Sequence, residues 1–192
     1  MFVRLGARLI LADNTAAELM QPGQAVYREV VERFGCQILN PDGKINRPRL
    51  AEIAFGHGGE GGRVRELNEI VHPAVVEREN QWMLEAGRAN PRVIAIVEAA
   101  LILEAGGAER FDRLVVVTCR PEQRIERFAK RLGIPEEAAR VEVTRRMAAQ
   151  LPDEVKIKAA DFVIDNSGSL DATAKQVENV FASLREEEKK KA

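Results

Sequence analysis

Four short apolar runs, rich in β-branched residues, are spaced along the chain. Each run is nearly continuous rather than alternating with polar residues, a pattern typical of strands buried on both faces of a parallel sheet. Segments with helical periodicity separate them, so the sequence predicts an α/β fold with a parallel sheet covered by helices. The runs are Ala7–Ala12, Val93–Glu98, Leu114–Thr118 and Phe162–Asp165.

The interval between the first two runs is too long for a simple crossover. Helical periodicity recurs there several times, and Asn40–Gly43 has the composition of a turn. His72-Pro73 is expected to open the last helix, because proline is favoured in a first turn. We interpret residues 14–90 as a helical insertion that covers a substrate. Its predicted helices are Gln24–Phe34, Arg47–Phe55, Arg63–Val71 and Ala74–Ala86.

A second helical region, residues 120–158, is rich in arginine. It begins with a predicted helix at Pro121–Leu132, and a second helix starts near Pro135. Residues 120–150 hold eight arginines and lysines against five glutamates, in a chain of net charge −1. This excess favours a mobile lid that closes over a phosphoryl group. The alternative is a solvated helix pair with Glu–Arg pairs at i,i+4.

Composition excludes several other classes. The near-neutral charge gives no general attraction to nucleic acid or membranes. Cys36 and Cys119 are far apart, which argues against a disulfide framework or a zinc knuckle. No run of about 18 apolar residues and no signal peptide is evident. We expect a cytoplasmic protein, monomeric or weakly homo-oligomeric, that ends in a helix at Asp171–Leu184 and a frayed charged tail.

Polar residues follow three of the predicted strands, at the edge where ligands bind in open parallel sheets. Asp13 is placed to take a proton from a substrate hydroxyl, although spacing alone favours a helix N-cap. Glu98 and Glu104 suggest either substrate contact or an exposed first turn of a helix. Asn166 to Gly168 could face an adenine edge or form a simple turn capped by Ser169.

Two further features have weaker signals. His72 could bind a phosphate or a ribose, or it could be a cap or a surface residue, and the two readings are evenly balanced. Gly56–Arg63 imitates the glycine spacing of a phosphate-binding loop. It lacks the Gly-Lys-Ser/Thr ending and follows a predicted helix, so we interpret it as a connecting loop.

In their order along the chain, these motifs resemble the dephospho-CoA kinase family, over about Phe2 to Leu184. The resemblance implies a three-layer, doubly wound parallel sheet of the P-loop kinase type, in a single domain of residues 1–192 with a helical insertion and a helical lid. It rests on Leu11-Ala12-Asp13, Ile38–Gly43, Glu69–Pro73, Leu101–Gly106, Phe111-Asp112, Arg127, Arg131, Gly133, Arg146, Gln150, Ala160-Asp161 and Val163–Asn166.

The resemblance also implies an activity: ATP-dependent phosphorylation of the ribose 3′-hydroxyl of dephospho-CoA, with Mg²⁺, in the last step of coenzyme A biosynthesis. Asp13 would be the base, and Arg146 would close over the ATP phosphates. His72 and Glu104 would bind the acceptor. The ATP-binding residues would be Arg127, Arg131, Gln150, Asn166 and Gly168, and no protein metal ligand is implied.

Some parts of the family pattern have no counterpart in these 192 residues. The family begins with a central strand and a Gly-x-x-x-x-Gly-Lys-Ser/Thr loop, whereas Met1–Gly6 resembles the end of the helix that follows that loop. Leu11 and Ala17 replace an Asp and a His. Without that strand, two others would face a gap, and each buried unpaired backbone group costs about 1–3 kcal/mol.

Three hypotheses remain open at this point. The chain is a kinase whose start was assigned too late, a binding protein for CoA or dephospho-CoA that lacks catalysis, or a truncated product without function.

Overall fold

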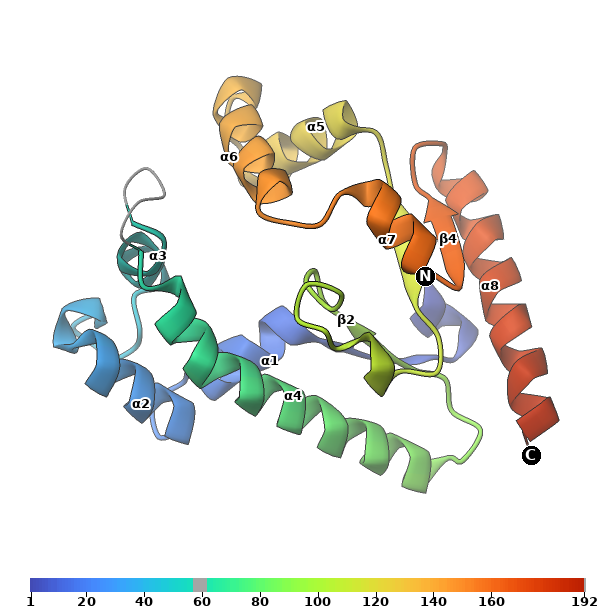
Figure 1. Ribbon diagram of the computed structural model, residues 1–192, viewed down its shortest axis with the longest axis horizontal. Helices are drawn as coiled ribbons and strands as arrows, with labels where there is room; N and C mark the ends of the chain where they lie inside the picture. The colour runs from blue at the N-terminus through green and yellow to red at the C-terminus, as the bar shows by residue number, and fades with distance from the viewer. Residues whose placement is uncertain (57–61, 192) are drawn as a thin grey trace. The chain divides into compact units, whose positions relative to one another are not determined.

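The computed structural model describes residues 1–56 and 62–191 and divides the chain into two compact units (Figure 1). The first unit comprises Met1–Gly6 and Ala100–Ala192, and the second comprises Ala7–Ala99. Each is described by itself. Most of the glycine-rich run at Gly56–Arg63 lies outside the described residues.

The second unit combines a short parallel sheet with four helices. Strand β1 pairs with β2 in parallel, and Leu11 lies opposite Glu98 at the end of the register. Between the strands the chain forms the helical segment that the sequence predicts, and α1 and α2 both pack against α4. The elements are β1 (Arg8–Leu11), α1 (Ala12–Leu19), α2 (Ala25–Phe34), η2 (Cys36–Ile38), α3 (Arg47–Phe55), α4 (Val64–Ala89) and β2 (Ala95–Glu98).

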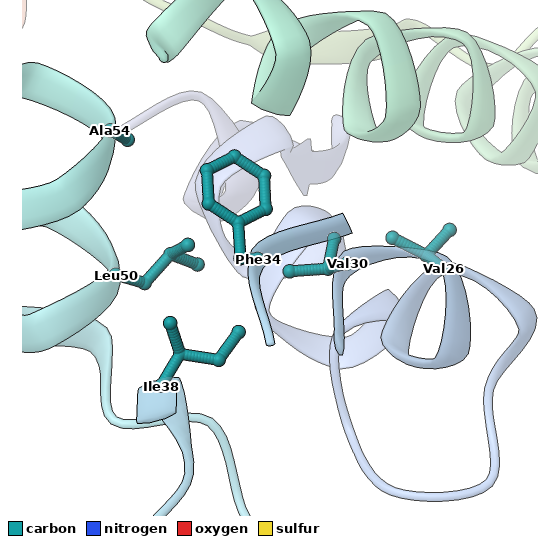
Figure 2. Close-up of a cluster of buried hydrophobic side chains, with 6 residues drawn as sticks. All are labelled: Val26, Val30, Phe34, Ile38, Leu50 and Ala54. Atoms are coloured by element: carbon teal, nitrogen blue, oxygen red, sulfur yellow. The ribbon is translucent and has the colours of Figure 1, made fainter. Parts of the chain in front are cut away.

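The core of this unit lies between α2, η2 and α3 (Figure 2). Val26, Val30 and Phe34 recur every four residues, so they form one face of α2. Ile38 and Leu50 complete the cluster together with Ala54, and Figure 2 shows these side chains gathered around the Phe34 ring. The Asn46 side chain caps α3 by accepting a hydrogen bond from the Arg49 N–H at 3.1 Å.

The prediction that His72-Pro73 opens a helix is wrong. Residues 64–89 form a single helix, α4, with Pro73 inside it. Proline removes one backbone hydrogen bond but keeps a helical φ. The apolar stripe of α4 explains why the helix continues, because its members on both sides of Pro73 pack against the same cluster. They are Leu67, Ile70, Val71 and Ala74.

The first unit contains the other parallel pair. Val115 lies opposite Phe162, and Thr118 lies opposite Asp165. Helix α8 packs against β4 through Ile164, Val177 and Val180. The elements are η1 (Phe2–Leu5), η3 (Ala108–Arg110), β3 (Val115–Thr118), α5 (Pro121–Leu132), α6 (Glu136–Ala148), α7 (Asp153–Ala159), β4 (Phe162–Asp165) and α8 (Leu170–Lys191).

Helices α5 and α6 form a hairpin with its own small core (Figure 1). Gly133 ends α5 with a φ of 65°, a left-handed conformation that favours glycine. The apolar residues of the two helices then meet around Phe128, so the hairpin is held by packing between its helices. The buried members are Ile125, Phe128, Ala129, Ala139 and Val143.

The predicted parallel α/β class is confirmed, but two details of the prediction are wrong. The strands are not buried on both faces: Ile164 is the only buried residue of β1 to β4, and Val117 is 58% exposed. Each described strand has only one neighbouring strand, so each lies at a sheet edge. The tail after Leu184 continues α8 rather than fraying, because Glu187 pairs with Arg113 at 2.8 Å.

Within the described residues, no helix combines the length and the apolar character needed to cross a membrane. The single-domain assignment of residues 1–192 stays a prediction.

Replacement of Phe34 by alanine should destabilise the second unit by about 3–5 kcal/mol, because the ring is 2% exposed at the centre of its core. Urea unfolding followed by the fluorescence of Trp82, the chain's one tryptophan, measures this loss. Leu84→Ala is the control, since Leu84 is 61% exposed and its removal should change the unfolding free energy by less than about 0.5 kcal/mol. Equal midpoints for Phe34→Ala and the unmodified chain would contradict the core assignment.

Candidate active site

The turn after β4 is tied to the base of the α5–α6 hairpin. The Arg127 Nη2 donates to the carbonyl of Asn166 at 2.9 Å, and the Gln123 Nε2 donates to the carbonyl of Ser167 at 3.0 Å. The Asn166 N–H donates to the carbonyl of Thr118 at 2.8 Å, which joins the turn to the end of β3. Two predicted nucleotide-binding residues, Arg127 and Asn166, are therefore brought into contact.

The same turn starts α8. The Ser169 Oγ accepts a hydrogen bond from the Ala172 N–H at 3.2 Å, so the capping interpretation of Ser169 is confirmed. The Asn166 Oδ1 accepts from the Thr173 hydroxyl at 3.1 Å. The side-chain NH₂ of Asn166 has no hydrogen-bond partner within residues 1–56 and 62–191, so it is available as a donor beside the exposed Gly168.

The exposed arginines of the hairpin gather around one aromatic ring. The guanidinium carbon of Arg131, on α5, lies 5.4 Å from the centroid of the Phe128 ring, and that of Arg146, on α6, lies 5.2 Å from it. The Arg146 Nε also donates to Glu142 at 2.7 Å. Hydrogen bonds from Arg145, and then from Arg146, hold the pKa of Glu142 below its usual value.

The alternative interpretation of this hairpin, with ion pairs along solvated helices, accounts for only part of it. Glu142–Arg146 is an i,i+4 pair. On α5, neither Glu122 nor Glu126 forms an ion pair with a basic residue in the part of the chain that the structure describes. Several positive charges therefore remain available to an anion, as a phosphate-binding lid requires.

Glu104 forms a largely buried clasp. Its Oε1 accepts from the Leu151 N–H at 2.9 Å and from the Lys156 Nζ at 3.0 Å, and that Nζ also donates to the Gln150 Oε1 at 2.7 Å. The side chains of Glu104 and Lys156 are 18% and 14% exposed. Burial raises the pKa of Glu104, but the Leu151 N–H and Lys156 outweigh this effect and hold that pKa below its usual value.

This geometry corrects one interpretation of Glu104 and adds a residue. Glu104 lies in a series of turns and is mostly buried, so it is not an exposed acid in the first turn of a helix. Its proposed contact with the acceptor stays a prediction. Sequence reasoning missed Lys156, since nothing local marks a lysine that pairs with a glutamate on a distant loop. The clasp fixes the segment that follows α6.

The remaining candidates belong to the second unit. Asp13 is exposed in the first turn of α1, but the capping position is Leu11, so the N-cap interpretation of Asp13 is wrong. Glu98 ends β2, and because β1 and β2 are parallel, Asp13 and Glu98 lie at the same edge of this sheet. His72 is exposed on α4. Asp13 and His72 are thus in a different unit from the lid arginines.

A parallel α/β fold with an arginine-bearing helical hairpin beside the end of a strand is typical of enzymes that transfer phosphoryl groups from nucleotides. A family model described as dephospho-CoA kinase matches residues 1–172. The chain belongs to the dephospho-CoA kinase family, whose members are phosphotransferases.

Curated relatives and solved structures agree with this assignment. The chain is 36% identical to a dephospho-CoA kinase of Corynebacterium efficiens, over 93% of this chain and 86% of that protein. It is 38% identical to one of Aquifex aeolicus, over 96% and 88%.

Protein TT1252 of Thermus thermophilus matches in structure with a TM-score of 0.72 and 27% identity, over 95% of this chain and 87% of that one. The dephospho-CoA kinase of Campylobacter jejuni matches with a TM-score of 0.64 and 23% identity over the same shares, which supports the fold alone.

The Glu104–Lys156 clasp should be measurable as stability. Glu104→Gln should lower the unfolding free energy of the first unit by about 1–3 kcal/mol, because Lys156 loses its charged partner in a largely buried site. Hydrogen exchange at the amides of β3 and β4 measures the change. Glu186→Gln is the control, because Glu186 is 63% exposed and its pair with Lys189 contributes little.

The sign of the pH dependence follows from the lowered pKa of Glu104. The contribution of the carboxylate is complete above the ordinary glutamate value of 4.5 and is lost as the pH falls through the lower folded-state pKa. The difference between Glu104→Gln and the unmodified chain should therefore shrink below about pH 4. A difference that grows on acidification would contradict the clasp.

Proposed function

We propose that the protein phosphorylates the ribose 3′-hydroxyl of dephospho-CoA, with ATP as the phosphoryl donor. The observation that carries the proposal is the pair of guanidinium groups of Arg131 and Arg146 around Phe128, on a hairpin attached to the turn after β4. Membership of the dephospho-CoA kinase family supplies the substrate class. In this role the hairpin of residues 120–158 is the lid.

The nucleotide would be held by the first unit. Arg131 and Arg146 would bind its phosphates, since planar guanidinium groups match phosphate oxygens in charge and geometry. The free NH₂ of Asn166, next to Gly168, would donate to the adenine edge. Gln150 lies at the lid's C-terminal hinge, and Arg127 holds the lid base to the turn. When bound, ATP supplies the transferred phosphoryl group.

The acceptor would be held by the second unit. The helices of residues 14–90 would cover dephospho-CoA, with His72 at its phosphate or ribose, and Glu104 of the first unit is a further candidate contact. Asp13, exposed directly after β1, would take the proton of the 3′-hydroxyl as that oxygen attacks.

Mg²⁺ is expected to accompany the nucleotide phosphates. Within the described residues, no three or more histidine, cysteine, aspartate or glutamate side chains gather as a metal site. We therefore assign no step to the metal ion.

A second candidate function is binding of CoA or dephospho-CoA without phosphoryl transfer. The observation that favours it is in the sequence: the 192 residues contain no Gly-x-x-x-x-Gly-Lys-Ser/Thr run. In P-loop kinases, the backbone and lysine of that run hold the β- and γ-phosphates.

One pair of measurements separates the two candidates. The 192-residue chain is assayed for ADP formation with ATP, Mg²⁺ and dephospho-CoA, and titrated with dephospho-CoA in a calorimeter. ADP formation that depends on dephospho-CoA supports the kinase. Binding without ADP formation supports the second candidate, and the absence of both contradicts both.

Arg146→Ala should lower the rate of ADP formation by about 10²–10³-fold, because a charge donor to the transferring group is lost. Arg140→Ala is the matched control: it removes an exposed arginine of the same helix that contacts neither Phe128 nor Glu142 in the described structure. Its rate should stay within about twofold, the range of an exposed side chain with little energetic role. Equal losses in the two variants would reduce Arg146 to general surface charge.

Asp13→Asn should lower the rate by about 10²–10⁴-fold, because the amide cannot take the hydroxyl proton. Calorimetric binding of dephospho-CoA should change little, since the two side chains have the same shape. Unchanged activity in this variant would exclude Asp13 as the base.

A further inference from the structure

Arg131 and Arg146 come from different helices and share one aromatic side chain. Both guanidinium carbons lie within 5.4 Å of the centroid of the Phe128 ring. An aromatic face attracts a cation at such distances through its quadrupole. The ring thus sets the positions of two charges that are separated by a turn and a whole helix in sequence.

The ring itself has little freedom. Phe128 is 8% exposed and packs with Ile125 of α5 and with Ala139 and Val143 of α6. The Arg146 side chain, in contrast, is 58% exposed, and an exposed arginine without contacts samples many rotamers. A fixed ring beneath a mobile guanidinium restricts those rotamers before any ligand arrives.

The contacts with the ring leave the phosphate-binding donors available. The N–H groups of a guanidinium point outward in its plane, whereas an aromatic ring attracts its face. Only the Nε of Arg146 is occupied, by Glu142. In the described part of the chain, neither the terminal nitrogens of Arg146 nor the guanidinium of Arg131 has a hydrogen-bond partner.

We propose that Phe128 is a positioning residue that holds Arg131 and Arg146 ready for a polyphosphate, an inference that rests on the proposed function of the lid. Phe128 does not touch the ligand. It acts by limiting the conformations of two residues that do. A purely structural role, in which the ring only fills the core of the hairpin, makes different predictions for substitutions that keep the volume and remove the ring.

The test compares three variants. Phe128→Leu keeps an apolar side chain in the core but removes the aromatic face. Phe128→Tyr keeps the face. Val143→Ala weakens the same core without touching the ring and serves as the control for packing. If Phe128→Leu does not fold, Phe128→Met takes its place, because its flexible thioether side chain adapts to the space.

The probe is tripolyphosphate, titrated without Mg²⁺ into the isotope-labelled 192-residue chain at low salt. The readouts are the Nε–Hε NMR signals of Arg131 and Arg146. In the unmodified chain, both signals should carry a ring-current shift and respond together to the anion. Phe128→Leu should abolish that shift and weaken binding by about threefold to tenfold, the range expected for exposed cation–π contacts. Phe128→Tyr should restore both, and Val143→Ala should leave the affinity unchanged.

Three results would overturn the proposal: an unmodified chain that does not bind tripolyphosphate, equal affinities in Phe128→Leu and the unmodified chain, or an equal loss in Val143→Ala. The titration needs neither dephospho-CoA nor turnover. If no ADP is formed but the ring-dependent affinity is found, the kinase proposal fails and the positioning role stands. If ADP is formed and the affinity does not depend on the ring, the positioning role fails alone.

Discussion

The hydrogen bond from Arg127 to the carbonyl of Asn166 is the contact on which the organisation of the first unit depends. With the neighbouring bond from Gln123 to Ser167, it attaches the α5–α6 hairpin to the turn after β4. That turn is joined to the end of β3 through Asn166 and also begins α8. One short segment therefore connects the sheet, the hairpin and the last helix, at the sheet edge where ligands bind in parallel α/β folds.

Charged side chains in this unit act in two different ways. Glu104 and Lys156 are largely buried and satisfy each other, which makes them structural. Arg131 and Arg146 are exposed and have donors that no described residue accepts, which suits them to an external anion. The single buried ring of Phe128 links this exposed pair to the packing of the hairpin. The stability of the hairpin core and the readiness of the lid for phosphate are thus coupled.

The limits of sequence-based prediction are visible at particular residues. The four strands and the helix at Pro121–Leu132 were found with small errors in their bounds, because continuous apolar runs and a helical repeat are local signals. Pro73 misled the prediction, since a local rule about proline was overridden by the apolar stripe that packs on both sides of it. Lys156 was missed because its partner is distant in sequence. Asp13 was separated from its predicted capping role only by the observed start of α1 at Ala12.

By itself, the sequence determined the α/β class, the parallel pairing, the arginine-rich hairpin and the family resemblance, since apolar periodicity, charge composition and the order of motifs are all properties of the linear chain. Only the tertiary structure decided which charges are consumed within the fold and which remain available. That distinction depends on distances between residues far apart in the chain, such as Glu104 and Lys156 or Arg131 and Arg146, and no local pattern encodes them.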